Sequence, residues 1–144
     1  PVVNSKGIFL DKKIKELNKE KIKLNITAVY SVSQTKKILS CIENSTPVII
    51  SIFAGRMADV GKDPIPIFKK SLRLSKKFKN VSILWASTRE PYNFTQASQL
   101  GCNIITVPPS IIKKIENFGS SFNELTSDTV KTFLRDAEKS KFKI

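Results

Sequence analysis

The apolar positions of the chain alternate between strand-like runs and helix-like spacings. Runs rich in β-branched and aromatic residues predict four strands, at residues 23–30, 48–53, 81–86 and 103–107, and residues 1–3 resemble the end of another. Apolar residues three and four positions apart predict helices at about 10–17, 32–42, 64–78, 111–118 and 127–139. Gly101 ends a further helical segment after Leu100.

The order of these elements indicates the architecture. Strands that alternate with helices form parallel sheets with right-handed crossovers, so the fold class is α/β. At 144 residues the chain has the size of a single domain. Two architectures fit: a small doubly wound sheet, or the second half of a (β/α)₈ barrel, which normally takes about 250 residues. The pattern alone does not separate them.

Polar side chains interrupt the apolar runs toward one end of the strands. With a side-chain period of two, Asn25, Thr27 and Val29 share one face of the first strand. An Asn–Thr pair on a buried face is unusual, because buried polar groups cost free energy unless they are hydrogen-bonded. Ser51 and Phe53 share a face of the second strand. This repetition favours a shared pocket at the carboxyl ends of the strands, where α/β proteins build their sites.

Arginines follow two of the predicted strands. The chain has only four arginines; Arg56 follows the second strand, and Arg89 follows the third, two residues after Ser87. Guanidinium groups suit phosphate bidentately, and a hydroxyl with turn N–H groups completes such a cradle. We therefore expect these three residues to converge on one anion. The alternative is that both arginines form surface ion pairs, for example with Asp59 or Glu90.

The net charge of +13 comes from 25 basic and 12 acidic residues. Such a charge is compatible with a nucleic-acid partner. However, the lysines occur as scattered pairs on helix-like segments, and no aromatic residues are interleaved with them for base stacking. A solvated surface is the favoured interpretation, and no nucleic-acid partner is expected.

The chain has no histidine, and its two cysteines, Cys41 and Cys102, lack CxxC spacing. A Cys–His zinc site and a Ser–His–Asp triad are therefore excluded within the chain, and no metal or cofactor is expected. Buried free thiols in a reducing cytosol are the default interpretation. No apolar stretch approaches the roughly 20 residues of a membrane helix and no signal segment is recognised, so we expect a cytoplasmic protein without a membrane partner.

Four segments, taken in order, carry a family resemblance. They are LNITAVYSVSQ at 24–34, SIFAGRMAD at 51–59, LWASTR at 84–89 and LGCNIITVP at 100–108. Each is weak alone, but together they resemble transaldolase and the related fructose-6-phosphate aldolases, from Pro1 to about Ile115, with a compatible tail helix. The resemblance implies a TIM barrel, of which residues 1–144 form a single (β/α) unit, the C-terminal half from the end of strand four to strand eight.

The resemblance also implies a chemistry for the complete protein. In this family a lysine amine forms a Schiff base with a ketose phosphate, and cleavage of a carbon–carbon bond releases an aldehyde. The retained dihydroxyacetone unit passes to an aldose acceptor or is freed. The implied partners are therefore sugar phosphates of carbohydrate metabolism, such as the pentose phosphates, and a homo-oligomer is expected.

Seven residues of this chain match functional residues of the family. Asn25 matches the family's asparagine that forms a hydrogen bond near the Schiff base. Thr27 matches the threonine that holds the catalytic water. The other five residues match positions that bind substrate in the family. Ser51 and Phe53 match residues that line the pocket, and the phosphate-binding set is matched by Arg56, Ser87 and Arg89.

Two positions depart from the family pattern. The family's Schiff-base lysine stands in a Lys-x-Pro context in which Pro1 matches the proline, so this lysine is absent here and is expected two residues before Pro1. Lys6 lies in a solvated loop and is not expected to replace it, so the chain alone should be inactive. Trp85 stands where the family more often has a small residue, and we expect it to pack in the core. The alternative function is a non-catalytic α/β domain that binds a phosphate sugar or a nucleotide.

Overall fold

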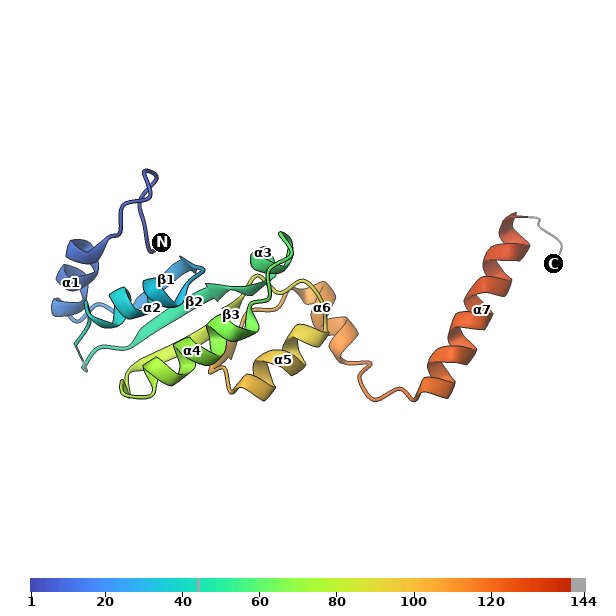
Figure 1. The fold of residues 1–144 in the computed structure, drawn as a ribbon. Coiled ribbons are helices and arrows are strands. Elements are labelled where there is room, and N and C mark those ends of the chain that lie inside the picture. Colours follow the sequence, from blue (N-terminus) through green and yellow to red (C-terminus); the bar gives the residue numbers. More distant parts are fainter. Residues whose placement is uncertain (44, 141–144) are drawn as a thin grey trace. The chain divides into compact units, whose positions relative to one another are not determined.

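The computed structural model describes residues 1–43 and 45–140, in two compact units, Pro1–Ile112 and Lys113–Ile144. The first unit holds the strands β1 (Leu24–Val29), β2 (Val48–Phe53), β3 (Val81–Ala86) and β4 (Ile104–Ile105) (Figure 1). Its helices are α1 (Asp11–Lys19), α2 (Val32–Leu39), α3 (Ala54–Ala58), α4 (Ile65–Ser75) and α5 (Tyr92–Leu100). Helix α6 (Pro109–Ile115) runs from the first unit into the second, and α7 (Phe122–Ser140) makes up most of the second.

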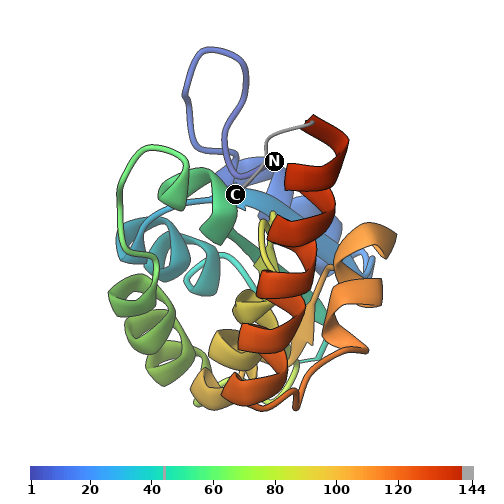
Figure 2. The same ribbon diagram turned by 90° about the vertical axis from the view of Figure 1, so that its right-hand side faces the viewer.

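The sheet of the first unit is parallel throughout, with the strand order β1-β2-β3-β4. Each strand thus pairs with the next strand along the chain, and α2 and α4 lie on the same face of the sheet (Figures 1 and 2). A doubly wound sheet reverses its strand order and covers both faces with helices, whereas a barrel continues in one direction with its helices outside. The α/β class is therefore confirmed, and the arrangement is consistent with part of a (β/α) barrel.

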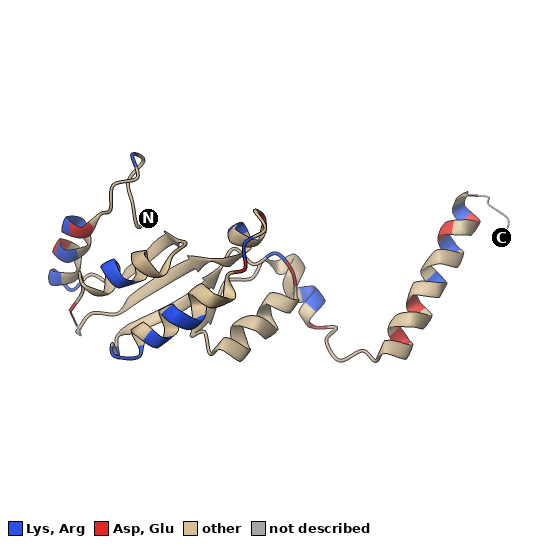
Figure 3. Ribbon diagram, viewed as in Figure 1, with Lys and Arg blue, Asp and Glu red and all other residues tan. Residues whose placement is uncertain are grey.

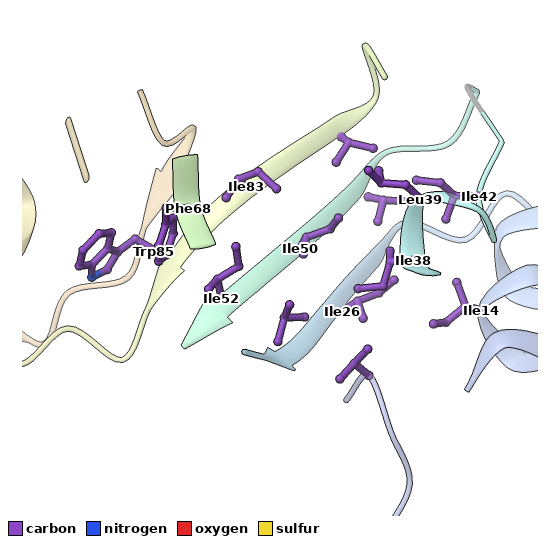
Figure 4. Close-up of a cluster of buried hydrophobic side chains, with 14 of the residues drawn as sticks. Ile14, Ile26, Ile38, Leu39, Ile42, Ile50, Ile52, Phe68, Ile83 and Trp85 are labelled. Atoms are coloured by element: carbon purple, nitrogen blue, oxygen red, sulfur yellow. The ribbon is translucent and has the colours of Figure 1, made fainter. Parts of the chain in front are cut away.

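Alternate strand residues fill the space between the sheet and its helices. Ile26, Ile50 and Ile83, from three neighbouring strands, are buried there (Figure 4). Trp85 stacks on Phe68 of α4 with ring centroids 4.5 Å apart, and both side chains are buried. Trp85 thus packs in the core, as expected, and the opposite face of the sheet is left for a site.

A bulge in β1 breaks the expected alternation of side chains. Between Ile26 and Val29, three steps along β1 match two steps along β2. Ala28 takes up the extra residue with a φ of +59°, a left-handed conformation that β-bulges next to sites often use to redirect a side chain. Val29 therefore faces the buried core, and the prediction that it shares a face with Asn25 and Thr27 is wrong.

Strand β4 and the N-terminal run are shorter than predicted. Strand β4 covers only Ile104–Ile105. It is an edge strand that forms two residue pairs with β3, and two prolines follow shortly after it in the sequence. Residues 1–3 form no strand. Val3 makes an isolated antiparallel bridge with Phe9, and Val2 N–H donates to the carbonyl of Thr27 at 2.9 Å, so this run lies beside β1.

Two helices differ from the sequence-based expectation. Helix α3 has only five residues, too few for a hydrophobic period to show. Helix α7 begins at Phe122 instead of Ser127, because Ser121 and Glu124 form a capping box. Glu124 N–H donates to Ser121 Oγ at 3.2 Å, and Ser121 N–H donates to Glu124 Oε2 at 2.7 Å.

The charged surface follows the helices. Figure 3 shows lysines and arginines on α1, α2 and α4, and every lysine among the described residues is exposed. Helix α7 has no buried residue, and its Phe122 and Phe133 are 87% and 65% exposed. None of the helices within the described ranges is long and apolar enough to cross a bilayer.

Candidate functional site

A pocket of about 360 Å³ opens at the carboxyl ends of β1, β2 and β3. All seven residues predicted for the site line it, together with Leu84, Ala86 and Thr106, which the sequence reasoning missed. The strand alternation could have found two of them, since Leu84 pairs with Ser51 and Ala86 with Phe53 in the register of the sheet. The full lining is Asn25, Thr27, Ser51, Phe53, Arg56, Leu84, Ala86, Ser87, Arg89 and Thr106.

A hydrogen bond across two strands fixes a polar pair in the pocket. Ser51 Oγ donates to Asn25 Oδ1 at 2.6 Å, and Ser51 is only 2% exposed. The Asn25 oxygen accepts from Ser51, and no hydrogen bond between described residues engages its amide nitrogen, so the nitrogen is left as a donor for a ligand. Asn25 itself is exposed and Thr27 is partly buried, so the expectation of a buried face is wrong for Asn25. The reason is that no described helix covers this side of β1.

Left-handed backbone flanks the pocket at two strand ends. Ala28 follows Thr27 with a φ of +59°, and Ser87 follows β3 with a φ of +64°. Non-glycine residues rarely adopt this conformation, which costs about 1–2 kcal/mol and concentrates at functional sites. At both positions the chain turns away from the regular strand where a pocket side chain is presented.

Gly55 lets helix α3 approach the turn after β3. A Cβ atom at this position would overlap the carbonyl oxygen of Ser87 and lie 2.8 Å from Arg89 Cγ. Only glycine fits such a close approach of two backbones. The glycine therefore brings Arg56, the next residue of α3, to the same end of the sheet as Ser87 and Arg89.

Arg89 forms an ion pair with Asp59. Its Nε–H donates to both carboxylate oxygens at 3.1 Å, and its Nη2–H donates to Oδ2 at 2.7 Å. This hydrogen bonding holds the pKa of Asp59 below its usual value and raises the pKa of Arg89 above its own. The ion-pair alternative thus applies to Arg89. Arg89 also lines the pocket, so its guanidinium group is paired with Asp59 and still accessible to a ligand.

Arg56 is arranged differently. Its guanidinium carbon lies 5.9 Å from the centroid of the Phe53 ring, within the range of a cation–π contact. Phe53 in turn meets Tyr30 edge to face at 5.8 Å. No carboxylate among the described residues forms an ion pair with Arg56. The aromatic ring thus supports the guanidinium, whose N–H groups are available to an anion.

The lining defines what the pocket can do. It holds two arginines and four hydroxyl groups, and no lysine or carboxylate among the described residues. The hydroxyl groups belong to Thr27, Ser51, Ser87 and Thr106. Such a pocket has the groups needed to bind an anion and to orient hydroxyl groups or a water, but it supplies neither an amine nucleophile nor a general base of its own. Within the described ranges, no cluster of three or more His, Cys, Asp and Glu side chains is arranged to hold a metal ion.

The remaining candidate residues lie away from this lining. Cys41 is buried, and burial raises the pKa of its thiol. Cys102 is only partly buried, in contrast to the expected full burial, and desolvation raises its pKa to about 11. Lys6 is exposed, in a loop where its N–H donates to Asn4 Oδ1 at 2.9 Å.

Together, the fold and pocket define an α/β protein with a polar pocket, lined by two arginines, at the carboxyl ends of a parallel sheet. The family model for Transaldolase/Fructose-6-phosphate aldolase matches residues 11–144, which include the terminal helix. The chain belongs to this family, and the resemblance seen in its sequence is confirmed.

Relatives with assigned names are similar over most of the chain. The chain is 31% identical to a probable transaldolase of Myxococcus xanthus over 135 residues. The matched region covers 92% of this chain and 56% of that protein. A probable transaldolase of Nitrosopumilus maritimus is 30% identical over 132 residues, 90% of this chain and 55% of that protein. The chain thus spans about half the length of the curated relatives it matches.

Proposed function

We propose that this chain forms the phosphate-binding and water-positioning part of a transaldolase-type enzyme. The complete enzyme would cleave a ketose phosphate through a Schiff base and transfer a dihydroxyacetone unit to an aldose in carbohydrate metabolism. The observation that carries this proposal is the shared pocket, since residues from three strands and their following turns line one cavity. Family membership supports the transaldolase class.

The anion end of the pocket comprises Arg56, Ser87 and Arg89. Two guanidinium groups and a hydroxyl suit the several oxygens of a phosphate, because charge-assisted hydrogen bonds are stronger than neutral ones. The pocket has no carboxylate among its described lining residues to repel that anion. We assign the phosphate of the sugar to this end.

A second polar group in the pocket comes from β1 and β2 and comprises Asn25, Thr27 and Ser51. We assign Asn25 to a hydrogen bond with the reacting part of the sugar, since Ser51 occupies its amide oxygen and leaves the amide nitrogen as a donor. We assign Thr27 to the catalytic water, which its hydroxyl can hold as donor or acceptor. Phe53 forms an apolar side of the pocket and supports Arg56.

The Schiff-base lysine is proposed to lie outside these 144 residues, two positions ahead of Pro1 as the resemblance implies. A lysine acts as a nucleophile when a desolvated pocket lowers its pKa. Every lysine of the described residues is exposed, and none of them lines the pocket. The chain alone is therefore proposed to bind sugar phosphate without converting it.

The test compares fructose 6-phosphate with fructose. Each sugar is titrated into the ¹⁵N-labelled chain, and chemical-shift changes are mapped onto the structure. Fructose 6-phosphate should shift the backbone signals of Arg56, Ser87 and Arg89 at concentrations where fructose does not. Arg56→Ala should abolish these shifts, whereas the matched Arg73→Ala, at an exposed position of helix α4, should not. Equal responses to both sugars, or shifts away from the pocket, would refute the proposal.

A non-catalytic phosphate-sugar or nucleotide-binding domain is the second candidate. The observation that favours it is the pocket's lack of an amine, imidazole or carboxylate among its described lining residues. The two candidates differ when the protein that contains the preceding residues is assayed. Borohydride trapping of a dihydroxyacetone adduct supports the enzyme, and binding without any adduct supports the binding domain. A cytoplasmic location remains a prediction in both cases.

A further inference from the structure

Asp59 contacts the phosphate end of the site from outside the pocket. Arg89 lines both the site pocket and a neighbouring cavity of about 310 Å³, which lies among residues of α3, β3 and α5. Asp59 lines the second cavity and, among the described residues, not the first. The ion pair therefore stands between the two cavities, with its arginine reaching the ligand side and its carboxylate on the other side.

The ion pair occupies one edge of the guanidinium group. Nε–H and Nη2–H donate to the Asp59 carboxylate, while no hydrogen bond between described residues engages Nη1. Guanidinium groups bind carboxylates and phosphates through parallel pairs of N–H groups. The edge that carries Nη1 thus remains for a second anion, and a phosphate in the pocket need not displace Asp59.

The rest of Arg89 is also held in place. Its backbone N–H donates to Asn93 Oδ1 at 2.9 Å, and Gly55 lies against its Cγ. Contacts therefore fix the backbone, the aliphatic stem and the head of one exposed arginine. Immobilising such a side chain on binding weakens affinity about two- to tenfold, and a side chain that is already ordered avoids that loss.

We propose that Asp59 is a positioning residue, which keeps the Nη1 edge of Arg89 turned into the pocket before a phosphate arrives. This inference rests on the proposed function of the pocket. Its consequence is counterintuitive, because Asp59 is an anion that strengthens the binding of another anion. A purely electrostatic role predicts the opposite, since removing a nearby carboxylate should tighten phosphate binding.

The sign of the change in phosphate affinity therefore tests the proposal. Inorganic phosphate is titrated into the ¹⁵N-labelled chain and into the variants Asp59→Ala, Asp59→Asn and Glu90→Ala. Asp59→Ala should raise the Kd about two- to tenfold, which corresponds to the cost of ordering one side chain. Asp59→Asn keeps an oxygen for Nε–H and loses the charge, so its Kd should equal or fall below that of the unaltered chain.

Glu90→Ala is the matched control for charge. It removes one carboxylate next to Arg89 that makes no hydrogen bond to the guanidinium, so it should leave the Kd unchanged or lower it. Thermal melts should show all three variants folded, since Asp59 and Glu90 are exposed. The ¹H–¹⁵N heteronuclear NOE of the Arg89 Nε–H should be as high as that of the backbone in the unaltered chain and fall in Asp59→Ala.

Two failures are distinguishable. If phosphate binds but Asp59→Ala binds it as tightly as the unaltered chain or more tightly, the positioning role is overturned and the phosphate site stands. A mobile Arg89 Nε–H in the unaltered chain overturns the positioning role in the same way. If phosphate causes no shift at Arg56, Ser87 and Arg89 in the unaltered chain, the phosphate site is overturned and the inference falls with it.

Discussion

Replacing Gly55 by alanine should damage the site and the stability of the chain together. The added Cβ would overlap the Ser87 carbonyl oxygen and lie 2.8 Å from Arg89 Cγ. The first obstacle is a backbone atom of a residue already held at a φ of +64°, so it cannot turn aside as a flexible side chain would. Helix α3 or the turn after β3 must therefore move.

The magnitude follows from two opposing terms. Overpacking a close contact costs about 1–3 kcal/mol, and alanine in a helix is up to about 1 kcal/mol better than glycine. Because the obstacle is backbone, the cost lies in the upper part of its range, and the free energy of unfolding should fall by about 1–2 kcal/mol. Displacing Ser87 and Arg89 should also remove at least one charge-assisted hydrogen bond of about 1.5–3 kcal/mol, which weakens phosphate binding about tenfold or more.

Urea denaturation and phosphate titration of the same sample measure both effects. Gly61→Ala is the control, because Gly61 has a φ of +71° and open space around its Cβ position. Alanine there carries only the left-handed backbone cost of about 1–2 kcal/mol, so stability should fall by a similar amount with phosphate binding intact. A Gly55→Ala chain as stable as the original and with the same phosphate affinity would refute the close approach on which the site geometry rests.

Four further outcomes are expected. In the complete enzyme that we propose, Arg56→Ala should lower kcat/KM for a sugar-phosphate substrate about ten- to a hundredfold, from the loss of a charge-assisted hydrogen bond, with little change for unphosphorylated dihydroxyacetone; an equal loss for both, or a matching fall in Tm, would make Arg56 structural. The 144-residue chain should give no borohydride-trapped adduct with fructose 6-phosphate by mass spectrometry, and an adduct on any lysine, Lys6 included, would contradict the assignment. The isolated chain should associate in light scattering, because β1 and β4 are edge strands and α7 exposes Phe122 and Phe133; a monodisperse monomer would argue against the half-barrel interpretation. Alkylation of Cys102 by iodoacetamide should be slow at pH 8 and accelerate up to about pH 11, because its pKa is raised to about 11 and the thiolate is the nucleophile; a rate that levels off below pH 9 would contradict this.

The sequence anticipated the pocket because its residues obey local rules. Strands β2 and β3 have the predicted bounds, since each is a continuous apolar run buried against helices. Parallel strands place their carboxyl ends at one edge of the sheet, so polar residues at those ends, such as Ser51 and Ser87, meet without any knowledge of the helices.

The features that the sequence did not reveal depend on contacts between distant segments. The bulge at Ala28 exists only through the register between β1 and β2, and it alone turns Val29 to the core. The sequence offered Asp59 only as an alternative partner of the two arginines, because no periodicity reports the contact that joins Asp59 to Arg89 across thirty residues. Asn25 is exposed because the described chain places no element over its face of β1, and burial of that kind is a property of the whole fold.

The bulge in β1 has a consequence for how sequence changes are tolerated there. Thr27 and Ala28 together stand opposite the single residue Ser51, so the strand changes the parity of its side chains midway. Its first part presents polar groups to the pocket, and its last residue, Val29, seals the core. Deleting Ala28 would leave Thr27 opposite Ser51 in a regular ladder and keep Val29 on the core face, so the deletion would remove only the left-handed turn between the last pocket residue and the core residue. Relatives that lack one residue here should therefore keep the same side chains on the same faces, and where the residue is present glycine would adopt the same φ without strain.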